Sequence, residues 1–256
     1  MIDFNDLVLG FKGLGLKKRD IVLVHSSFKS FGGVEGGPQT VINALLDILG
    51  SEGTLIMPTF TFNFCEEYNE TGEGYFDVDN TPSKMGILTE IVRKMPEAKR
   101  SVNPIYSVAV YGNKVNYLSS VNDKNVFGKN SIFGRLTELD AKMMIIGLSY
   151  NNSWTYVHHV EEMKGVDYRY HKDFSGTIVV DGKKYKDTFT MLVRDVERGV
   201  QTAVDPMGEI LEKRGAVRIK KIGQSSVKLM KSTKQIFKIT AEMLKKNPKL
   251  FYEIKP

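Results

Sequence analysis

The chain has 256 residues, 41% of them hydrophobic and 26% charged, a composition that is typical of a globular protein and excludes a disordered one. No apolar run approaches the roughly 20 residues that cross a bilayer. No secretion leader opens the sequence, and the single cysteine, Cys65, excludes an internal disulfide and a thiolate zinc site. The formal charge is +6. We therefore expect a cytoplasmic protein with no membrane partner.

The first half of the chain alternates strand and helix patterns. A β-branched run at 21–25 is followed by a glycine-rich turn, an amphipathic stretch at 40–49 and a second apolar run at 53–58. Strand, helix and strand in this order build a parallel crossover in a sheet that is buried on both faces. We expect the next helix to begin at Thr81-Pro82, and further strands at 107–111 and 141–147.

After Gly176 the pattern changes. Two short β-prone stretches flank Asp181-Gly182, which predicts a hairpin around a tight turn. The sequence therefore predicts an α/β fold of three layers, α/β/α, with a mixed and largely parallel sheet. A small antiparallel β addition is expected in the C-terminal half, at about 174–223. No repeat or linker divides the chain, so 1–256 is read as a single domain.

The basic residues concentrate at 213–256, which holds 13 Lys or Arg against two Glu. Apolar residues from Val227 to Leu244 recur at helix-like spacing between the lysines, which favours a solvated helix face. A second interpretation is that some of these cations border a site for a phosphorylated ligand. A nucleic-acid surface is disfavoured, because interleaved aromatic residues and a known binding module are both missing.

A polar, glycine-rich loop at 25–38 follows the first predicted strand and leads into a helix. In a parallel sheet this is the edge where ligands collect, and a helix start offers free N–H groups. The loop contains neither a Walker sequence nor the dinucleotide-binding glycine spacing. We interpret it as a ligand-binding loop, with a flexible turn as the alternative. Its donors and glycines include Ser26, Ser27, Lys29, Ser30, Gly32 and Gly33.

A second candidate site follows the strand that ends at Gly147. His158 and Glu161 are three residues apart, so on a helix they project from one face. A carboxylate beside an imidazole fixes the tautomer of the ring and stabilises the imidazolium that forms. An imidazole with a neighbouring carboxylate is therefore the minimal general base. His159 and Glu162 point elsewhere. No further ligand stands at metal-binding spacing, so we expect no metal.

Six carboxylates and no basic residue occupy the segment 66–79. Like charges at this density repel, so the segment is expected to be an exposed loop or to wrap around a cation, rather than to pack as a regular element. A solvated loop and a substrate-facing loop both remain open. Cys65 stands beside these carboxylates, which raise its pKa and make it a poor nucleophile.

Several motifs, in the same order along nearly the whole chain, resemble those of the aminoglycoside 3-N-acetyltransferases and their relatives, which are acyl-CoA-dependent enzymes. The motifs are 24–33 (VHSSFKSFGG), 36–38 (GGP), 53–60 (GTLIMPTF), 76–77 (FD), 81–86 (TPSKMG), Arg100-Ser101, Pro104, 127–131 and 155–161 (TYVHHVE). The resemblance implies acetyl-CoA or another short acyl-CoA as cofactor. The residues that would hold it are those of the 26–33 loop together with Thr81, Ser83, Arg100 and Ser101.

The resemblance also implies that His158 acts as base at an amine, with Glu161 beside it. Most amines are protonated at neutral pH, so attack on a thioester requires a base. Donors of the Ser/Gly loop can stabilise the oxyanion, and no covalent enzyme intermediate is required. The expected partners are acyl-CoA and a small amine acceptor, without nucleic acid, and a homodimer remains open.

The chain departs from the resistance enzymes around the catalytic segment, where it is aromatic and basic. Trp154, Tyr168, Arg169 and Lys172 suit a nucleotide through stacking and phosphate pairing. The favoured acceptor is therefore a dTDP-linked 3-amino-3,6-dideoxy sugar for surface polysaccharide. The alternative is an aminoglycoside, with antibiotic resistance as the role and acidic residues such as Asp77 binding the polycation. A non-catalytic CoA or nucleotide binder is the third interpretation, and the retained His158/Glu161 pair speaks against it.

Overall fold

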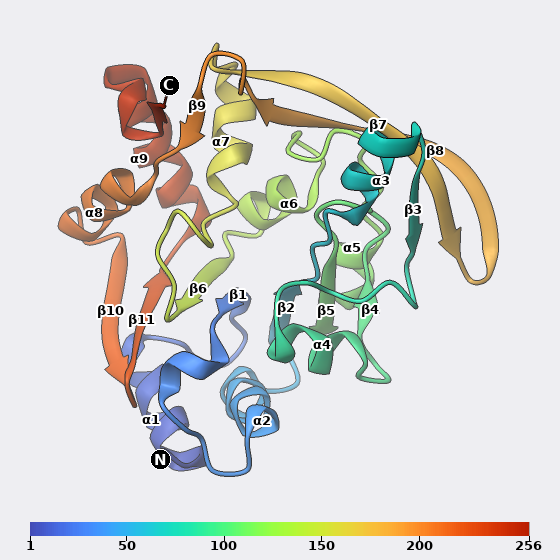
Figure 1. Ribbon diagram of the computed structural model, residues 1–256. Coiled ribbons are helices and arrows are strands. Elements are labelled where there is room, and N and C mark those ends of the chain that lie inside the picture. The colour runs from blue at the N-terminus through green and yellow to red at the C-terminus, as the bar shows by residue number, and fades with distance from the viewer. Residues whose placement is uncertain (256) are drawn as a thin grey trace.

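The computed structural model describes residues 1–255 and is built around a seven-stranded sheet (Figure 1). Parallel pairing is confined to its centre, where β1 pairs with both β2 and β6, and the outer strands are antiparallel. In spatial order the strands are β10 (Val217–Ile222), β11 (Ser225–Met230), β6 (Lys142–Ile146), β1 (Ile21–Ser26), β2 (Thr54–Pro58), β5 (Val108–Gly112) and β4 (Lys99–Arg100). The mixed α/β prediction and the strand–helix–strand crossover at 21–58 are confirmed.

Helices cover both faces of this sheet, as Figure 1 shows. Those on one face are α1 (Phe4–Leu14), α2 (Pro38–Leu49) and α4 (Ile87–Arg93). On the other face lie α5 (Val115–Ser119), α6 (Ile132–Glu138), α7 (Val157–Lys164), α8 (Asp205–Lys213) and α9 (Thr233–Lys246). Alternate residues of β1 enter opposite cores, Val22 and Val24 on the first face and Leu23 on the second. The central strands are therefore buried on both sides, as their apolar runs predict.

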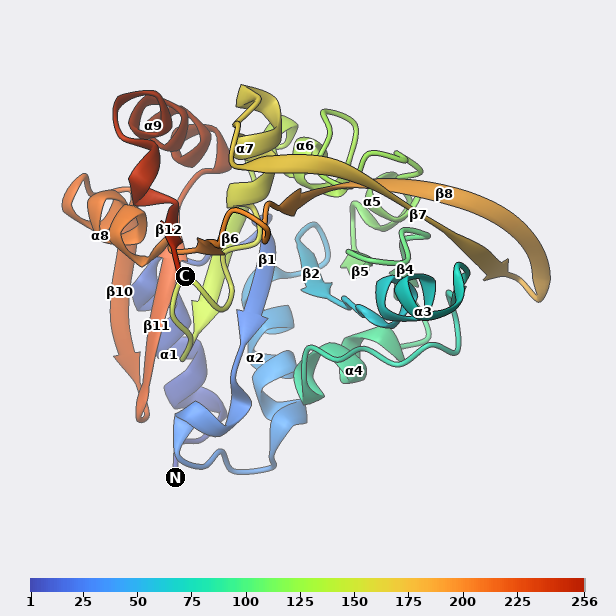
Figure 2. The ribbon, with the colours of Figure 1, turned by 45° about the horizontal axis from the view of Figure 1, so that its top comes forward.

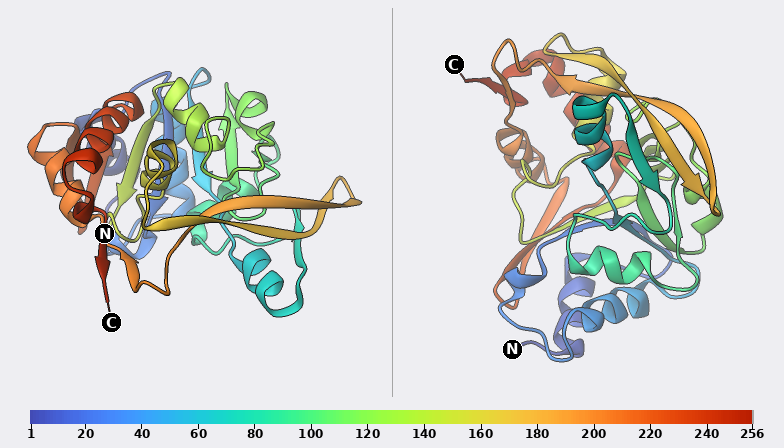
Figure 3. Two further views of the ribbon diagram at one scale, coloured as in Figure 1. Left: turned by 90° about the horizontal axis from the view of Figure 1, so that it is seen from above. Right: turned by 45° about the vertical axis from the view of Figure 1, so that its right-hand side comes forward.

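A second sheet is formed by β3 (Gly74–Asp77), β7 (Arg169–Val180) and β8 (Lys183–Arg194). The β7–β8 hairpin arches over the body and its tip projects away from it (Figures 2 and 3). Asp181 and Gly182 both have positive φ, 49° and 71°, which confirms the predicted tight turn. The hairpin begins at Arg169, earlier than expected. A small pair joins β9 (Val200–Thr202) to β12 (Tyr252–Ile254), and the 3-10 turns are η1 (Phe28–Phe31) and η2 (Pro248–Leu250).

Three expectations about individual elements are wrong. The acidic segment is not an unpacked loop: it forms most of α3 (Asn63–Thr71) and all of β3, because Phe64 and Phe76 are buried while the carboxylates face outward. The helix expected at Thr81 begins at Ile87, after Gly86 with a φ of 103°. Val227 belongs to β11 and not to a helix, because the apolar spacing that suggested a helix also fits a buried strand.

Within residues 1–255, no helix combines the length and the apolar character that crossing a bilayer requires.

Candidate active site

The site lies at the carboxyl edge of the parallel strands. From β1 the chain continues to α2 on one face of the sheet, and from the neighbouring β6 it continues to α7 on the other face. Such a reversal between adjacent parallel strands opens a crevice where α/β proteins bind ligands. The ends of β1 and β6 are joined by a hydrogen bond of 2.8 Å from the backbone N–H of Ser27 to the carbonyl of Ile146.

His158 and Glu161 form the centre of the site. Both lie on α7, and His158 Nδ1 is 2.6 Å from Glu161 Oε2, as their helical spacing predicts. Glu161 is fully buried and also accepts a hydrogen bond of 2.8 Å from the Tyr168 hydroxyl. Arg169 Nε lies 2.8 Å from Glu161 Oε2 as an ion pair, although its N–H is not directed at the oxygen. The Glu161 carboxylate thus holds the His158 imidazole in one orientation through Nδ1.

Burial and charge set the protonation states of this pair. Burial lowers the pKa of His158, and the charge of Arg169 lowers it further, while Glu161 partly offsets both effects. Burial raises the pKa of Glu161, but the charges of His158 and Arg169 and its hydrogen bonds outweigh burial and leave that pKa below its ordinary value. At neutral pH the pair is therefore a neutral imidazole beside a carboxylate, which is the state a general base requires.

Two cavities meet at His158. The smaller has a volume of about 210 Å³ and is also lined by His25 and Trp154. The larger has a volume of about 500 Å³ and is also lined by residues of the β7–β8 hairpin. Because Nδ1 faces Glu161, Nε2 is the nitrogen left for a ligand. His158 lines both cavities, so a molecule in each cavity can reach the same imidazole.

The other histidines of the region are structural. Nδ1 of His159 lies 2.7 Å from the carbonyl of Phe127 in the core, so His159 and His158 point in different directions, as expected. His171, on β7, pairs with Glu162 on the protein surface. Within residues 1–255, no group of His, Cys, Asp and Glu side chains is arranged to hold a metal ion.

The residues predicted to bind substrate divide into two groups. Trp154 lines the smaller cavity, and Arg169 and Lys172 line the larger one. Tyr168 lines neither cavity: its hydroxyl supports Glu161 from behind and its ring stacks on Tyr252 at 4.2 Å, so it positions the carboxylate. Asp77 lines neither cavity, and its carboxylate accepts hydrogen bonds from Asp79 and Asn80 within a turn.

The predicted cofactor loop lies at the same sheet edge, but none of its residues from Ser26 to Gly33 lines either cavity. Gly32 and Gly33 have φ of 77° and 126°, values that favour glycine. Ser30 donates to the carbonyl of Ser27 and to the Ser225 hydroxyl. Contact of this loop with coenzyme A therefore remains a prediction.

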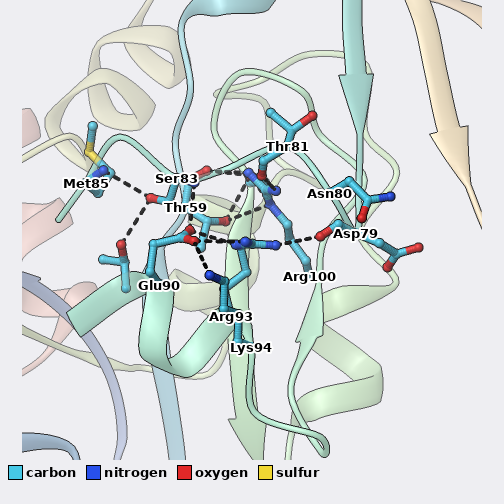
Figure 4. Close-up of polar contacts among 12 residues, drawn as sticks. Thr59, Asp79, Asn80, Thr81, Ser83, Met85, Glu90, Arg93, Lys94 and Arg100 are labelled. Atoms are coloured by element: carbon cyan, nitrogen blue, oxygen red, sulfur yellow. Dashed lines mark hydrogen bonds and ion pairs between the residues drawn. The ribbon is translucent and has the colours of Figure 1, made fainter. Parts of the chain in front are cut away.

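Arg100 is buried, and most of its donors bind within the protein. All three of its guanidinium nitrogens donate hydrogen bonds to protein oxygens, among them Oγ1 and the carbonyl of Thr59 and the carbonyl of Thr81 (Figure 4). Ser101 accepts a hydrogen bond from the backbone of Val108, and the Ser83 hydroxyl accepts hydrogen bonds from Met85 and Thr89. This cluster holds the 79–101 region together and occupies most of the donors of Arg100, so its contact with coenzyme A stays a prediction.

Three residues of the site were missed from the sequence. His25 is buried and Tyr106 is half-buried in the cavity walls, and burial lowers the pKa of His25 to about 4, so it is neutral. Arg194 lines the larger cavity and is the register partner of Arg169 across the hairpin. The tight turn at Asp181-Gly182 fixes that register, so this pairing could have been found by counting back from the turn.

Cys65 is a poor nucleophile for a reason other than the one expected. Burial raises its pKa to about 12, Lys172 lowers it slightly, and the neighbouring Glu66 contributes least. Cys65 lies on the buried face of α3, and its thiol remains protonated at neutral pH.

Known proteins are similar to this chain over most of its length. Residues 23–245 match the family model described as aminoglycoside 3-N-acetyltransferase. The SPbeta prophage-derived aminoglycoside N(3')-acetyltransferase-like protein YokD of Bacillus subtilis (strain 168) is 28% identical over 88% of this chain and 86% of that protein. Aminoglycoside N(3)-acetyltransferase VII of Streptomyces paromomycinus is 30% identical over 67% of this chain and 64% of that enzyme.

Solved structures share the fold. The crystal structure of YokD superposes with a TM-score of 0.82 at 25% identity, covering 97% of this chain and 95% of that one. A structure described as AAC-IIIb binary with CoASH superposes with a TM-score of 0.83 at 21% identity, covering 99% of both chains. The three-layer arrangement is therefore that of the aminoglycoside acetyltransferase structures.

Proposed function

Because the chain belongs to the aminoglycoside 3-N-acetyltransferase family, an acyl-CoA-dependent class of N-acyltransferases, we propose that it transfers the acetyl group of acetyl-CoA to the primary amine of an amino sugar, with His158 as general base. The observation that carries the proposal is the His158–Glu161 pair, 2.6 Å apart, with the free edge of the imidazole open to two cavities.

His158 performs the proton transfer. Its Nδ1–H donates to the Glu161 carboxylate, so Nε2 is unprotonated and accepts a proton from the amine as the amine attacks the thioester carbonyl. The C–N bond forms and the C–S bond breaks, and the imidazolium then returns its proton to the departing thiolate. The carboxylate of Glu161 stabilises the imidazolium between these two steps. No covalent enzyme intermediate is needed.

The smaller cavity suits the thioester end of acetyl-CoA, which supplies the activated acyl group. The indole N–H of Trp154 is buried without a protein partner in the described chain, and the neutral His25 lines the same cavity. Both are donors that can face the thioester carbonyl, where negative charge develops during attack. The loop from Ser26 to Gly33 lies just beyond this cavity and would hold the phosphates, with Lys29 as its exposed cation.

For the acceptor, the relatives are named for aminoglycosides. Their names support the aminoglycoside alternative better than the dTDP-linked 3-amino-3,6-dideoxy sugar, and none of them supports a role in surface polysaccharide. A non-catalytic binder is disfavoured by the complete His158–Glu161–Tyr168 arrangement. An amino sugar with a free primary amine is the common element of both acceptor hypotheses.

The test is acetyl-CoA-dependent thiol release with kanamycin-type antibiotics and nucleotide-linked amino sugars, with the product verified by the mass of one added acetyl group. His158→Ala should lower turnover at least about 100-fold and leave acetyl-CoA binding intact. The matched control is His171→Ala, which removes the surface partner of Glu162 and should keep wild-type turnover. Equal turnover in both variants would remove His158 from the mechanism.

A further inference from the structure

The larger cavity beside His158 is cationic. Arg169, Lys172 and Arg194 line it, and no acidic residue does so within the described chain. Arg169 forms an ion pair with the buried Glu161. Lys172 contacts Asn69, and Arg194 contacts Gln201, so both keep their charge next to neutral amide oxygens. Neither forms an ion pair with any carboxylate in residues 1–255.

The carboxylates that could have neutralised this cavity face elsewhere. Glu67, on α3, accepts from the backbone of Tyr75. Glu66 lies 3.6 Å from Lys84, and Glu73 pairs with Lys186 on the hairpin. The acidic helix therefore does not supply the cavity with the negative groups that a polycation would need.

On the basis of the proposed function, we infer that the larger cavity is an acceptor subsite for an anionic group, a phosphate or a carboxylate, recognised by Arg194 and Lys172. The substrate class would then be an amine that carries a negative charge near the acylated nitrogen. Guanidinium and ammonium groups without acidic partners are the usual ligands of such anions. A polycationic antibiotic would instead meet like charges at this wall.

The phosphates of coenzyme A do not account for these cations. Arg169 and Arg194 line the same cavity as His158, so they lie near the nitrogen at which the reaction occurs. The pantetheine arm separates the thioester from the diphosphate by its full length. With the thioester at His158, the phosphates are held far from Arg194, which leaves the acceptor as the source of the anion.

The test compares glucosamine with glucosamine 6-phosphate, which share the amine and differ by the phosphate, and adds kanamycin as a polycation. In the wild type we expect KM for the phosphorylated sugar to be lower by about tenfold or more. Arg194→Gln and Lys172→Gln should bring this ratio toward one, while the KM for acetyl-CoA stays unchanged. Lys184→Gln, at the exposed tip of the same hairpin, removes the same charge away from the cavity and should keep the ratio.

A ratio of one in the wild type would overturn the inference, as would a wild-type KM for kanamycin that is no higher than that for glucosamine 6-phosphate. A rise in the KM for acetyl-CoA in Arg194→Gln would assign the cavity to coenzyme A and also overturn it. If no amine is acetylated, the proposed function is wrong, and calorimetric binding of glucosamine 6-phosphate still decides the subsite. Binding that weakens about tenfold in Arg194→Gln supports it, and absence of binding in the wild type contradicts it.

Discussion

Glu161 and Arg100 are both buried charged residues, and both stand in motifs that resemble the same family, yet the structure uses them in different ways. Glu161 holds His158, whose other edge opens onto two cavities. The guanidinium of Arg100 donates hydrogen bonds to oxygens of Thr59 and Thr81 (Figure 4) and of other neighbours such as Ser107. It also lies over the ring of Phe76, 4.7 Å from its centre.

The difference separates a reactive group from a stabilising one. A buried charge whose hydrogen bonds are all made within the protein contributes to folding and has nothing left for a ligand. A catalytic group keeps one atom free at a cavity and is held by its other atoms. Burial lowers the pKa of Arg100 to about 10, so it is still charged at neutral pH, and most of its donors bind oxygens within the fold.

The largest effect is expected from Arg100→Met, which tests the stabilising side of this comparison. The change leaves several buried oxygens without donors and should lower the free energy of unfolding by at least about 3 kcal/mol. Urea unfolding measures this loss. The neighbouring exposed Lys99→Met is the control and should stay within about 0.5 kcal/mol. If stability is kept while acetyl-CoA binding weakens, Arg100 contacts the cofactor after all.

Glu161→Gln tests the role of Glu161 as the partner of the reactive His158. Gln keeps the size of the side chain but cannot stabilise the imidazolium, so turnover should fall at least about 100-fold while acetyl-CoA binding persists. The variant also leaves Arg169 buried without its counter-charge, so folding has to be verified by circular dichroism. Glu162→Gln changes the adjacent carboxylate that pairs with His171 and should be nearly silent. A similar loss in both variants would contradict the special role of Glu161.

The pH dependence sharpens the comparison further. Because burial and Arg169 lower the pKa of His158 below 6.5, kcat/KM should rise with pH through a midpoint under 6.5 and then level off. Removing the positive charge in Arg194→Gln should move this midpoint upward, since Arg194 also lowers that pKa. A wild-type midpoint above pH 6.5 would show that the rise of kcat/KM reports the deprotonation of a group other than His158.

The smallest effect is expected from Lys29→Ala. Lys29 lies on the loop after β1 with its side chain exposed, and no contact to a protein partner holds it in the described chain. Its loss should weaken acetyl-CoA binding by roughly tenfold and leave the free energy of unfolding unchanged. This is the reverse of the pattern expected for Arg100→Met. Calorimetry with unchanged affinity would move the phosphate contacts away from this loop.

Local patterns predicted the parts of the molecule that local physics determines. The strand–helix–strand crossover at 21–58 and the helical spacing of His158 and Glu161 depend on neighbours within a few residues. The pairing of β3 with β7 joins Tyr75 to Thr177, and nothing in either segment specifies a partner so distant along the chain. The hydrogen bonds of Arg100 within the protein could not be predicted either, because a motif specifies a residue type but not how many of its donors the fold already uses.

The hairpin gives the active site a remote point of sensitivity. Arg169 and Arg194 face each other at its base, and the turn at 181–182 lies at the far end of two strands of 12 residues each. A single residue inserted or deleted at that exposed tip would shift the register and turn one of the two arginines to the opposite face. Evolution could therefore alter the charge beside His158 through a change in loop length, without replacing any residue that touches the substrate.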